Sequence, residues 1–587
     1  MKNTYYAGPS MPISNEIDSM KYRQDGETYH DKVIRLAGAL MDSEEHRMYL
    51  EDILGNMRFL AAGRVQSSMG ASKITTSYNC FVIGDIEDSM DSIMEKAHEA
   101  AETMRRGGGC GYDFSRIRPR GDIIHSLNSQ ASGPVSYMGI YDAVCQTISS
   151  SGHRRGAQMA VLRVDHPDVG EFVRAKRNSD KLTGFNISVG VTDQFMEALE
   201  AEDDSFDLVF NDKVYETISA RALWDDIMES NYDWAEPGVL FLDRMNEMNN
   251  LWYCETLAAS NPCAEQPLPS NGACLLGSFN LTKYLECTKV HDKYDHYSFD
   301  YALFKTDIPH VVRAMDNVID RTVYPLKAQE DEARNKRRMG LGLTGLANTG
   351  ELLGYPYGSP EFLEWSEGIF KLLRNGTYRA SADLAQEKGP FPMYSEKLLK
   401  SGFAKTLPYK LRKRIKEYGL RNSHLTSIAP TGTISLVADN ISGGIEPTFS
   451  RSYDRIIQTF DGPRTDRVQD YAVSKGATVR TADELTVNEH LSVLALAQYY
   501  VDSACSKTIN VGDEVDYSSF KDIYAQAWKE GCKGTTTFRL SGKRFGILKA
   551  VETEEESESE AKSIEEESAT QAEACYFDVN TGQRECS

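Results

Sequence analysis

The sequence has no run of about 18 consecutive apolar residues, the length that a helix needs to cross a bilayer. Its first 30 residues also lack the apolar core of a secretory signal peptide. We therefore expect a cytoplasmic protein without a membrane partner. The 11 cysteines fit a reducing compartment, where thiols are catalytic, redox-active or simply buried.

Basic residues are scarce relative to acidic ones. The chain has 65 Lys and Arg against 87 Asp and Glu, a formal net charge of −22. Residues 552–587 hold 12 acids and 2 bases, a net of −10, so −12 remains for the rest of the chain. An acidic body argues against nucleic acid as the main partner, while free nucleotides in local basic pockets stay compatible with it.

Histidines at metal-ligand spacing are also lacking. Neither His153 nor His166 is accompanied by a second ligand at a useful distance along the chain. The sequence therefore predicts no metal site.

The length of 587 residues exceeds that of a usual single core, so we expect subdomains unless the chain forms a large barrel. Apolar periodicity predicts helix over residues 28–60, so we expect an N-terminal helical segment at 1–60 ahead of a body at 61–548. Residues 549–587 form the third part. Glu, Ser and Ala dominate 552–573, which predicts a disordered acidic tail.

One stretch concentrates reactive groups. It reads Asn-Pro-Cys-Ala-Glu-Gln-Pro-Leu at 261–268, and Cys-Leu-Leu-Gly-Ser-Phe-Asn-Leu follows at 274–281. In an extended or tightly turned backbone, Asn261, Cys263 and Glu265 share one face. A thiol beside a carboxyl and an amide suits nucleophilic, redox or radical chemistry, but a buried structural cysteine in a loop fits this stretch equally well.

Two further segments have the composition of anion sites. A strand at 425–429 runs into Pro430 and then into Thr431, Gly432, Thr433, Ile434 and Ser435. A helix start with three hydroxyls suits a phosphate, although an ordinary structural turn is the alternative. Glycines at 340, 342 and 345 only superficially resemble a dinucleotide-binding motif, and we attribute them to close helix packing.

The second segment begins at Asp88, which we expect to cap an amphipathic helix. The glycine-rich run 107–111 is expected to stop that helix, and three arginines follow within 116–120. By composition this is either a solvated basic loop or an anion site. Cys80 opens a short apolar strand nearby and, taken alone, is most simply a buried residue.

The motifs at 261–268 and 274–281 closely resemble the catalytic signature of the ribonucleotide reductase large chain, and the resemblance extends from about residue 58 to residue 539. It implies a ten-stranded α/β barrel with a central finger loop that carries Cys263 as a thiyl radical. It also implies Glu265 as general base on the ribose 3′-hydroxyl and Asn261 as an orienting amide. Cys80 and Cys274 would supply two electrons and form a disulfide.

Residues 534–539 read Gly-Thr-Thr-Thr-Phe-Arg and lack the adjacent tyrosine pair of reductases that receive their radical from a separate subunit. The segment is similar instead to the adenosylcobalamin-dependent class. The resemblance thus implies reduction of ribonucleoside diphosphates to 2′-deoxyribonucleoside diphosphates with adenosylcobalamin as cofactor. The alternatives are a large subunit that needs a separate radical-generating metal subunit, or an inactive nucleotide-binding regulator.

The resemblance also implies partners. Residues 431–435 would bind the substrate diphosphate, and Asp88 and Arg118 a deoxynucleoside triphosphate or ATP effector across a homodimer. The loop at 149–158 would relay effector identity. Cys575 and Cys586 would carry electrons from thioredoxin or a glutaredoxin-like protein. The N-terminal segment is shorter than the ATP-sensing domain of some reductases, so we expect no overall on/off control of that kind.

Overall fold

The computed structural model describes residues 5–72, 75–124, 126–148, 157–177, 181–290, 294–459, 462–513 and 515–539. It also describes two short strands at 576–578 and 583–585. Cys575, Cys586 and residues 149–156 of the predicted relay loop at 149–158 lie outside the described residues. Among the helices that are described, none is long and apolar enough to cross a membrane.

The centre of the molecule is an eight-stranded sheet of order β13-β2-β3-β6-β7-β10-β21-β20. Its strands are β13 (Ala273–Cys274), β2 (Cys80–Val82), β3 (Gly109–Asp113), β6 (Gln158–Arg163), β7 (Phe185–Val191), β10 (Gly238–Phe241), β21 (Gly534–Phe538) and β20 (Thr508–Asn510). The five strands from β2 to β10 are parallel, while β21 is antiparallel to β10 and parallel to β20. Every residue of β7 is buried, which is typical of a parallel strand covered on both faces.

A second sheet has three strands, β1 (Phe59–Ala61), β14 (Leu276–Asn280) and β17 (Gly340–Thr344). The predicted α/β class is therefore confirmed, but within the described residues the strand ladders do not close into a barrel. Segment 425–428 connects the sheets only by isolated bridges, Leu341 to Thr426 and Ile428 to Cys505. The reason is local, because the Asp502 carboxylate accepts the backbone N–H groups of Leu425 and Thr426 that a ladder would otherwise use.

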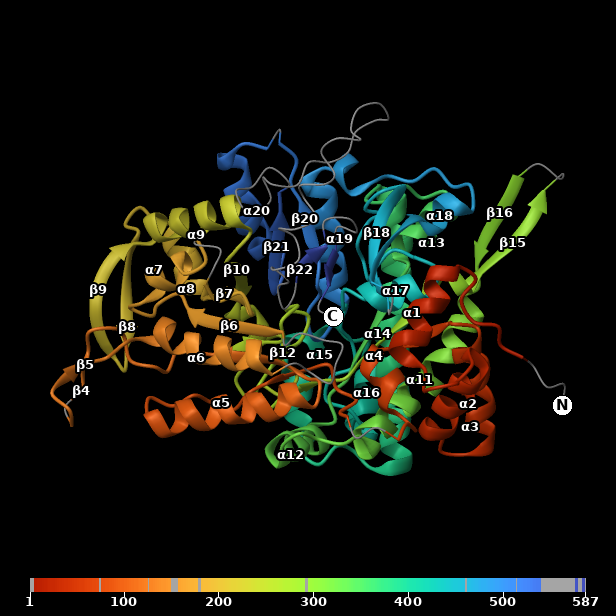
Figure 1. The fold of residues 1–587 in the computed structure, drawn as a ribbon, viewed down its shortest axis with the longest axis horizontal. Coiled ribbons are helices and arrows are strands. Elements are labelled where there is room, and N and C mark those ends of the chain that lie inside the picture. The colour runs from red at the N-terminus through yellow and green to blue at the C-terminus, as the bar shows by residue number, and fades with distance from the viewer. Residues whose placement is uncertain are drawn as a thin grey trace.

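Helices connect the parallel strands and cover the sheet (Figure 1). In chain order these are α5 (Met90–Arg105), α6 (Pro134–Thr147), α7 (Val169–Arg174), α8 (Asp193–Glu200), α9 (Ala220–Trp234) and α10 (Leu242–Glu247). Thr192 caps α8, since its hydroxyl accepts the N–H of Phe195. Between α8 and α9, β8 (Ser205–Phe210) and β9 (Lys213–Ser219) form an antiparallel hairpin.

The N-terminal helices are α1 (Pro12–Tyr22), α2 (Tyr29–Leu40), α3 (Glu44–Gly55) and α4 (Gly63–Ser68). They lie at the right of Figure 1 and pack through α2 and α3 onto α11 (Tyr301–Arg321). A capping box between Thr28 and Asp31 starts α2. The N-terminal segment is therefore docked on the body through an apolar core that the two share.

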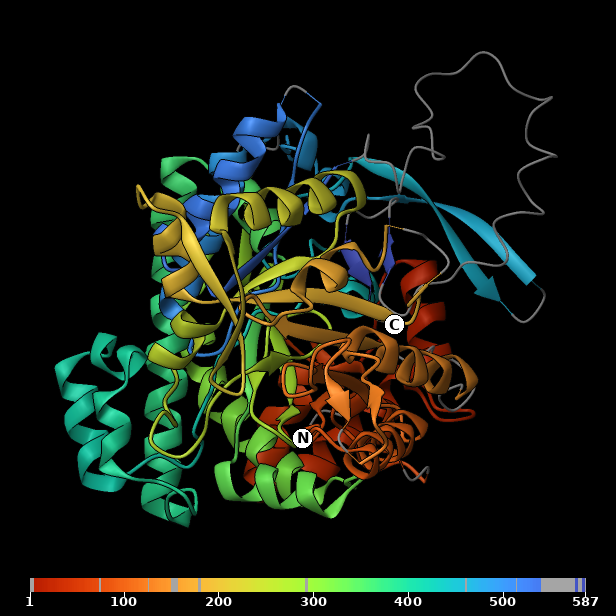
Figure 2. The same ribbon diagram turned by 90° about the vertical axis from the view of Figure 1, so that its left-hand side faces the viewer.

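The remaining helices come from the second half of the chain. They are α12 (Lys327–Lys336), α13 (Leu346–Leu352), α14 (Pro360–Lys388), α15 (Gly402–Thr406), α16 (Tyr409–Tyr418), α17 (Gly432–Val437), α18 (Tyr471–Ser474), α19 (Val487–Tyr500) and α20 (Tyr517–Lys529). Of these, α19 and α20 pack against β20 and β21 of the large sheet. Two hairpins project from this half: β15 (Leu285–Val290) with β16 (Tyr294–Phe299), and β18 (Ser452–Thr459) with β19 (Gly462–Gln469). Figure 2 shows β18–β19 extending away from the body.

The glycine-rich run 107–111 follows the end of α5 at Arg105, as predicted, and its last three residues begin strand β3. The other glycine-rich segment differs from its predicted role. The glycines at 340 and 342 belong to β17 rather than to a helix contact. A Cβ on Gly342 would lie 2.3 Å from the Ser427 carbonyl oxygen, so the close approach of another backbone requires glycine there.

Candidate active site

The predicted reactive stretch forms a closed loop between two paired strands. Strand β11 (Ala259–Ser260) pairs antiparallel with β12 (Pro267–Leu268). Within the 261–266 loop, the Asn261 N–H donates to the Gln266 carbonyl (3.2 Å) and the Gln266 N–H donates to Asn261 Oδ1 (3.0 Å). Ala264 adopts a left-handed φ of +64°, a conformation that side chains other than glycine adopt at an energetic cost. The loop thus holds Cys263 at its turn, and the cysteine is buried.

Glycines of β3 allow the loop to lie against the large sheet. A Cβ on Gly111 would lie 2.1 Å from the Ser260 carbonyl oxygen, an impossible contact. A Cβ on Gly109 would lie 3.5 Å from Pro262 Cγ and 3.3 Å from Cys80 Sγ. Cys80 and the loop therefore meet over the same point of β3.

Strand register places the two predicted electron donors opposite each other. Cys80 of β2 and Cys274 of β13 are direct partners in an antiparallel pair, and no disulfide joins them. Directly opposed residues in such pairs have Cα atoms about 4.5–5.5 Å apart, inside the range of about 4.4–6.8 Å that a disulfide spans. Both lie in a small apolar cluster separate from the main core.

Glu265 is the titratable group of the loop. It is 2% exposed, and burial raises its pKa to about 7, with the nearby Asn261 side chain acting in the opposite direction. Its Oε2 atom has no hydrogen-bond partner, nor do the two amide heteroatoms of the adjacent, fully buried Gln266. A carboxyl with this pKa exchanges protons near neutral pH, and the unpaired polar atoms suit a hydroxyl-bearing ligand.

Beside Cys263 is a cavity of about 20 Å³ that adjoins β21 and β10. Ser188, Cys505 and Thr535 line it together with Cys263. The Thr535 hydroxyl is buried and unpartnered. Sequence analysis did not identify Ser188 and Cys505, which belong to no motif of their own, whereas Thr535 lies in the 534–539 segment that resembles the adenosylcobalamin-dependent class.

The predicted phosphate segment, which we term the 431–435 turn, adjoins the same loop. Ser427 donates its hydroxyl to the Glu265 carbonyl (2.8 Å), and four residues later the chain enters the turn and helix α17. Of the three predicted hydroxyls, those of Thr431 and Ser435 bond to each other (2.9 Å). The Thr433 hydroxyl and the first backbone N–H groups of α17 are the groups left for an anion.

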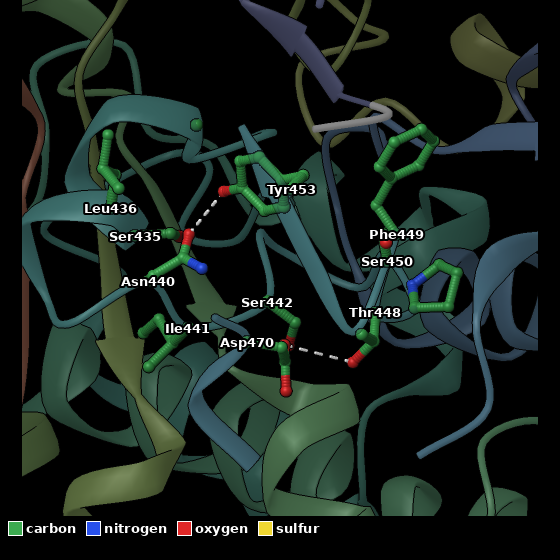
Figure 3. A pocket seen from close by; sticks show the side chains of 12 residues that line it. Ser435, Leu436, Asn440, Ile441, Ser442, Thr448, Phe449, Ser450, Tyr453 and Asp470 are labelled. Carbon is green, nitrogen blue, oxygen red and sulfur yellow. Dashed lines mark hydrogen bonds between the residues drawn. The ribbon is translucent and has the colours of Figure 1, made fainter. Parts of the chain in front are cut away.

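A second cavity, of about 30 Å³, lies beside α17 (Figure 3). Tyr453 donates its hydroxyl to Asn440 Oδ1 (2.7 Å) on one side, and Thr448 donates to Asp470 (3.3 Å) on the other. Figure 3 shows these pairs on opposite sides of the opening. Sequence analysis missed this wall, since hydroxyl and amide residues scattered over 440–470 give no local signal.

Asp88 and Arg118, the predicted effector residues, are brought together. Arg118 donates from its backbone N–H (3.1 Å) and from Nε (2.7 Å) to the Asp88 carboxylate. Asp88 is not the predicted helix cap, because Ser89 caps α5 by accepting the N–H of Ser92. The pair is partly exposed, so a ligand has access to both side chains.

No group of metal-binding side chains occurs among the described residues. His166 is structural: it is buried, its Nε2 lies 2.9 Å from the Ile117 carbonyl, and its Nδ1 accepts the N–H of Asp168. His153 lies outside the described residues.

Comparisons with known proteins agree with this geometry. Residues 78–538 match the family described as ribonucleotide reductase, barrel domain. The vitamin B12-dependent ribonucleoside-diphosphate reductase of Mycobacterium tuberculosis is 35% identical over 85% of this chain and 72% of its own length. The protein of the same name from Thermoplasma acidophilum is 33% identical over 88% of this chain and 68% of its own length. The ribonucleoside-diphosphate reductase large subunit of vaccinia virus is 24% identical over 82% of this chain and 70% of its own. The chain belongs to the ribonucleotide reductase family.

Proposed function

We propose that the chain is an adenosylcobalamin-dependent reductase of ribonucleoside diphosphates. The observation that carries the proposal is the convergence on one point of β3: the loop with Cys263 and Glu265 lies against the register pair Cys80–Cys274. Relatives named as vitamin B12-dependent ribonucleoside-diphosphate reductases support the cofactor and the substrate class. In this proposal segment 425–428 bridges the two sheets as walls of a barrel, and the 261–266 loop serves as its finger loop.

Each group of the loop has a defined role in this reaction. The Cys263 thiyl removes the ribose 3′-hydrogen while Asn261 orients the sugar. Glu265 takes the 3′-hydroxyl proton, and the 2′-hydroxyl accepts a proton from one thiol of the Cys80–Cys274 pair and leaves as water. The pair gives two electrons and its second proton to the sugar, Glu265 returns its proton to the 3′-oxygen, and Cys263 gives back the 3′-hydrogen atom. Cys80 and Cys274 are left as a disulfide. Their register makes that bond possible without movement of the strands.

The residues around the cavity beside Cys263 suit the reactive end of adenosylcobalamin. The buried, unpartnered Thr535 hydroxyl is a hydrogen-bond group for it, and Ser188 lies on the same wall. When bound, the cofactor supplies the radical that takes the hydrogen atom of Cys263. A cavity of about 20 Å³ holds one water molecule, so its walls must open for the cofactor.

The substrate diphosphate would lie on the 431–435 turn, which offers the backbone N–H groups of Gly432, Thr433 and Ile434. Ser435 would support the turn rather than bind the phosphate. Gly432 and Thr433 are partly exposed and so accessible to a ligand. The Ser427 hydroxyl bonds to the Glu265 carbonyl, so the segment that leads into the turn lies against the 261–266 loop. This contact supports one substrate that reaches both the turn and the loop.

An effector nucleotide would bind at Asp88 and Arg118, with two copies of the chain paired there. Large apolar side chains are exposed around this pair, on α5, on the short strands β4 (Ile123–Ile124) and β5 (Ser129–Gln130) with their connection, and on β9. They are Met90, Met94, Ile123, Leu127 and Val214. Contact with a second copy would remove them from water.

Residues 549–587 would serve as a redox tail on the body at 61–548, with residues 1–60 as a docked helical segment. Strand β22 (Tyr576–Asp578) pairs with β23 (Gln583–Glu585) so that Tyr576 faces Glu585. Cys575 and Cys586 are the next residues outward in sequence, which makes their spacing compatible with a reacting pair. Strand β23 contacts α17, which supports delivery of electrons to the site from thioredoxin or a glutaredoxin-like protein.

The proposal is tested by assaying the purified chain alone for deoxynucleoside diphosphate formation, with and without adenosylcobalamin. We expect turnover only with the cofactor. Turnover that needs a separate metal-containing subunit instead would favour the subunit-dependent class. Effector binding without any turnover under either condition would identify an inactive regulator.

A further inference from the structure

A triangle of buried hydroxyls connects β17 to the 431–435 turn. Thr344, the last residue of β17, is fully buried, and its Oγ1 lies 2.9 Å from Thr431 Oγ1 and 2.7 Å from Ser435 Oγ. The Thr431 and Ser435 oxygens are themselves 2.9 Å apart. One side chain from another element thus contacts the first and the last residue of the turn.

Two backbone groups extend the triangle. The Thr344 hydroxyl lies 3.1 Å from the Ser442 carbonyl, which accepts. The Gly444 N–H completes the arrangement by donating to Thr431 Oγ1 (2.7 Å). These contacts engage the hydroxyls of Thr431 and Ser435, so the backbone N–H groups at the start of α17 are the groups available to an anion.

The triangle surrounds a strained residue. Thr431 has a φ of +58°, a left-handed conformation that is a clear outlier for a β-branched side chain. Such a conformation persists only where the surroundings impose it, and it sets the direction of the following N–H groups. We propose that Thr344 is a positioning residue that holds the 431–435 turn in its phosphate-binding conformation. This inference rests on the proposed function of the turn.

The effect of losing the Thr344 hydroxyl should be confined to the phosphate end of the substrate. Thr431 would relax from its left-handed conformation, and the N–H groups of residues 432–434 would turn away from the phosphate. The 261–266 loop, which would hold the ribose, makes no hydrogen bond to Thr344 among the contacts described. Affinity for a nucleoside should therefore survive a change that lowers affinity for its diphosphate.

The test uses Thr344→Val in the full chain, which keeps the side-chain shape and removes the hydroxyl. Calorimetry would give the Kd of a ribonucleoside diphosphate and of the matching nucleoside. We expect the diphosphate Kd to rise about tenfold with the nucleoside Kd unchanged. KM should rise with little change in kcat at saturation. Thr344→Ser, which keeps the hydroxyl, should restore the wild-type ratio.

Thr377→Val is the matched control, because Thr377 is equally buried and its hydroxyl bonds only to the backbone of its own helix α14. Its ratio of the two Kd values should equal that of the wild type. If T344V does not fold, Ser435→Ala removes another corner of the triangle and should produce the same selective loss.

An unchanged diphosphate Kd in T344V would overturn the inference, as would an equal loss for nucleoside and diphosphate, which marks a merely structural residue. A different result concerns the premise. If the wild-type chain binds nucleoside and diphosphate equally well, the turn does not bind phosphate, and the proposed role of the turn fails together with the inference.

Discussion

At the residue scale, Glu265 owes its proton affinity to burial, with no charged neighbour among the causes of its pKa shift. A carboxyl in such a position stays protonated until about pH 7, whereas the same group in the unfolded chain ionises near pH 4.5. Desolvation raises the pKa of Glu265 and so prepares it for proton transfer. The same desolvation lowers the free energy of unfolding above about pH 4.5, the pKa of this group in the unfolded chain.

We expect the single-turnover rate of the pre-reduced chain to rise with pH through about 7, because Glu265 must lose its proton before it can accept that of the substrate. Glu265→Gln should remove this rise and lower the rate by roughly 10²–10⁴-fold. Rapid-quench assays between pH 5.5 and 8.5 measure both effects.

Stability gives an independent check on the same group. Between about pH 4.5 and 7 the wild-type folded state retains a proton that the unfolded state loses, so its stability falls over that interval relative to Glu265→Gln. Thermal unfolding should show the variant gaining on the wild type as pH rises from 5 to 8. A constant difference would contradict the raised pKa.

At the scale of elements, the contact between the 261–266 loop and β3 decides where Cys263 lies. Gly111 of β3 faces the Ser260 carbonyl, a backbone atom that cannot move without shifting β11. The glycine-rich run thus leaves room for the loop to pack against β3. Composition alone indicates only that the run stops a helix.

Gly111→Ala should destabilise the chain by about 2–4 kcal/mol and displace the loop, because the added Cβ would lie 2.1 Å from the Ser260 oxygen. Chemical denaturation measures the loss. The matched control is Gly139→Ala in α6, where no atom lies within 4 Å of the added Cβ and stability should change little or rise. Equal stabilities of the two variants would refute the close contact.

At the scale of the whole molecule, electrons must reach thiols that lie in a buried apolar cluster. Cys80 and Cys274 are almost inaccessible in the described structure, and the proposed shuttle cysteines are beyond an acidic linker. A linker of about 36 residues reaches at most about 120 Å when extended, more than the diameter of a protein of this length. Re-reduction of the Cys80–Cys274 disulfide by the tail cysteines is therefore a separate step from reduction of the substrate.

The double variant Cys575→Ala/Cys586→Ala should complete one turnover and then stall with thioredoxin, while dithiothreitol should restore repeated turnover. Cys80→Ala or Cys274→Ala should fail in the first turnover, because the source of two electrons is lost. Single-turnover and steady-state assays distinguish the two outcomes. Cys254→Ala/Cys287→Ala, which removes two exposed cysteines, is the matched control and should behave as wild type. Full thioredoxin-driven turnover by the tail variant would leave its cysteines without a redox role.

The sequence by itself determined the family, through the local motifs at 261–268 and 274–281, and the α/β class followed from that resemblance. Tertiary structure decided what depends on contacts between distant segments. The register that opposes Cys80 and Cys274, the pKa of Glu265 and the hydroxyl triangle around Thr431 arise only when separate strands pack together. Strand pairing and desolvation are properties of the packed chain, and local sequence does not encode which distant backbone will cover a given side chain.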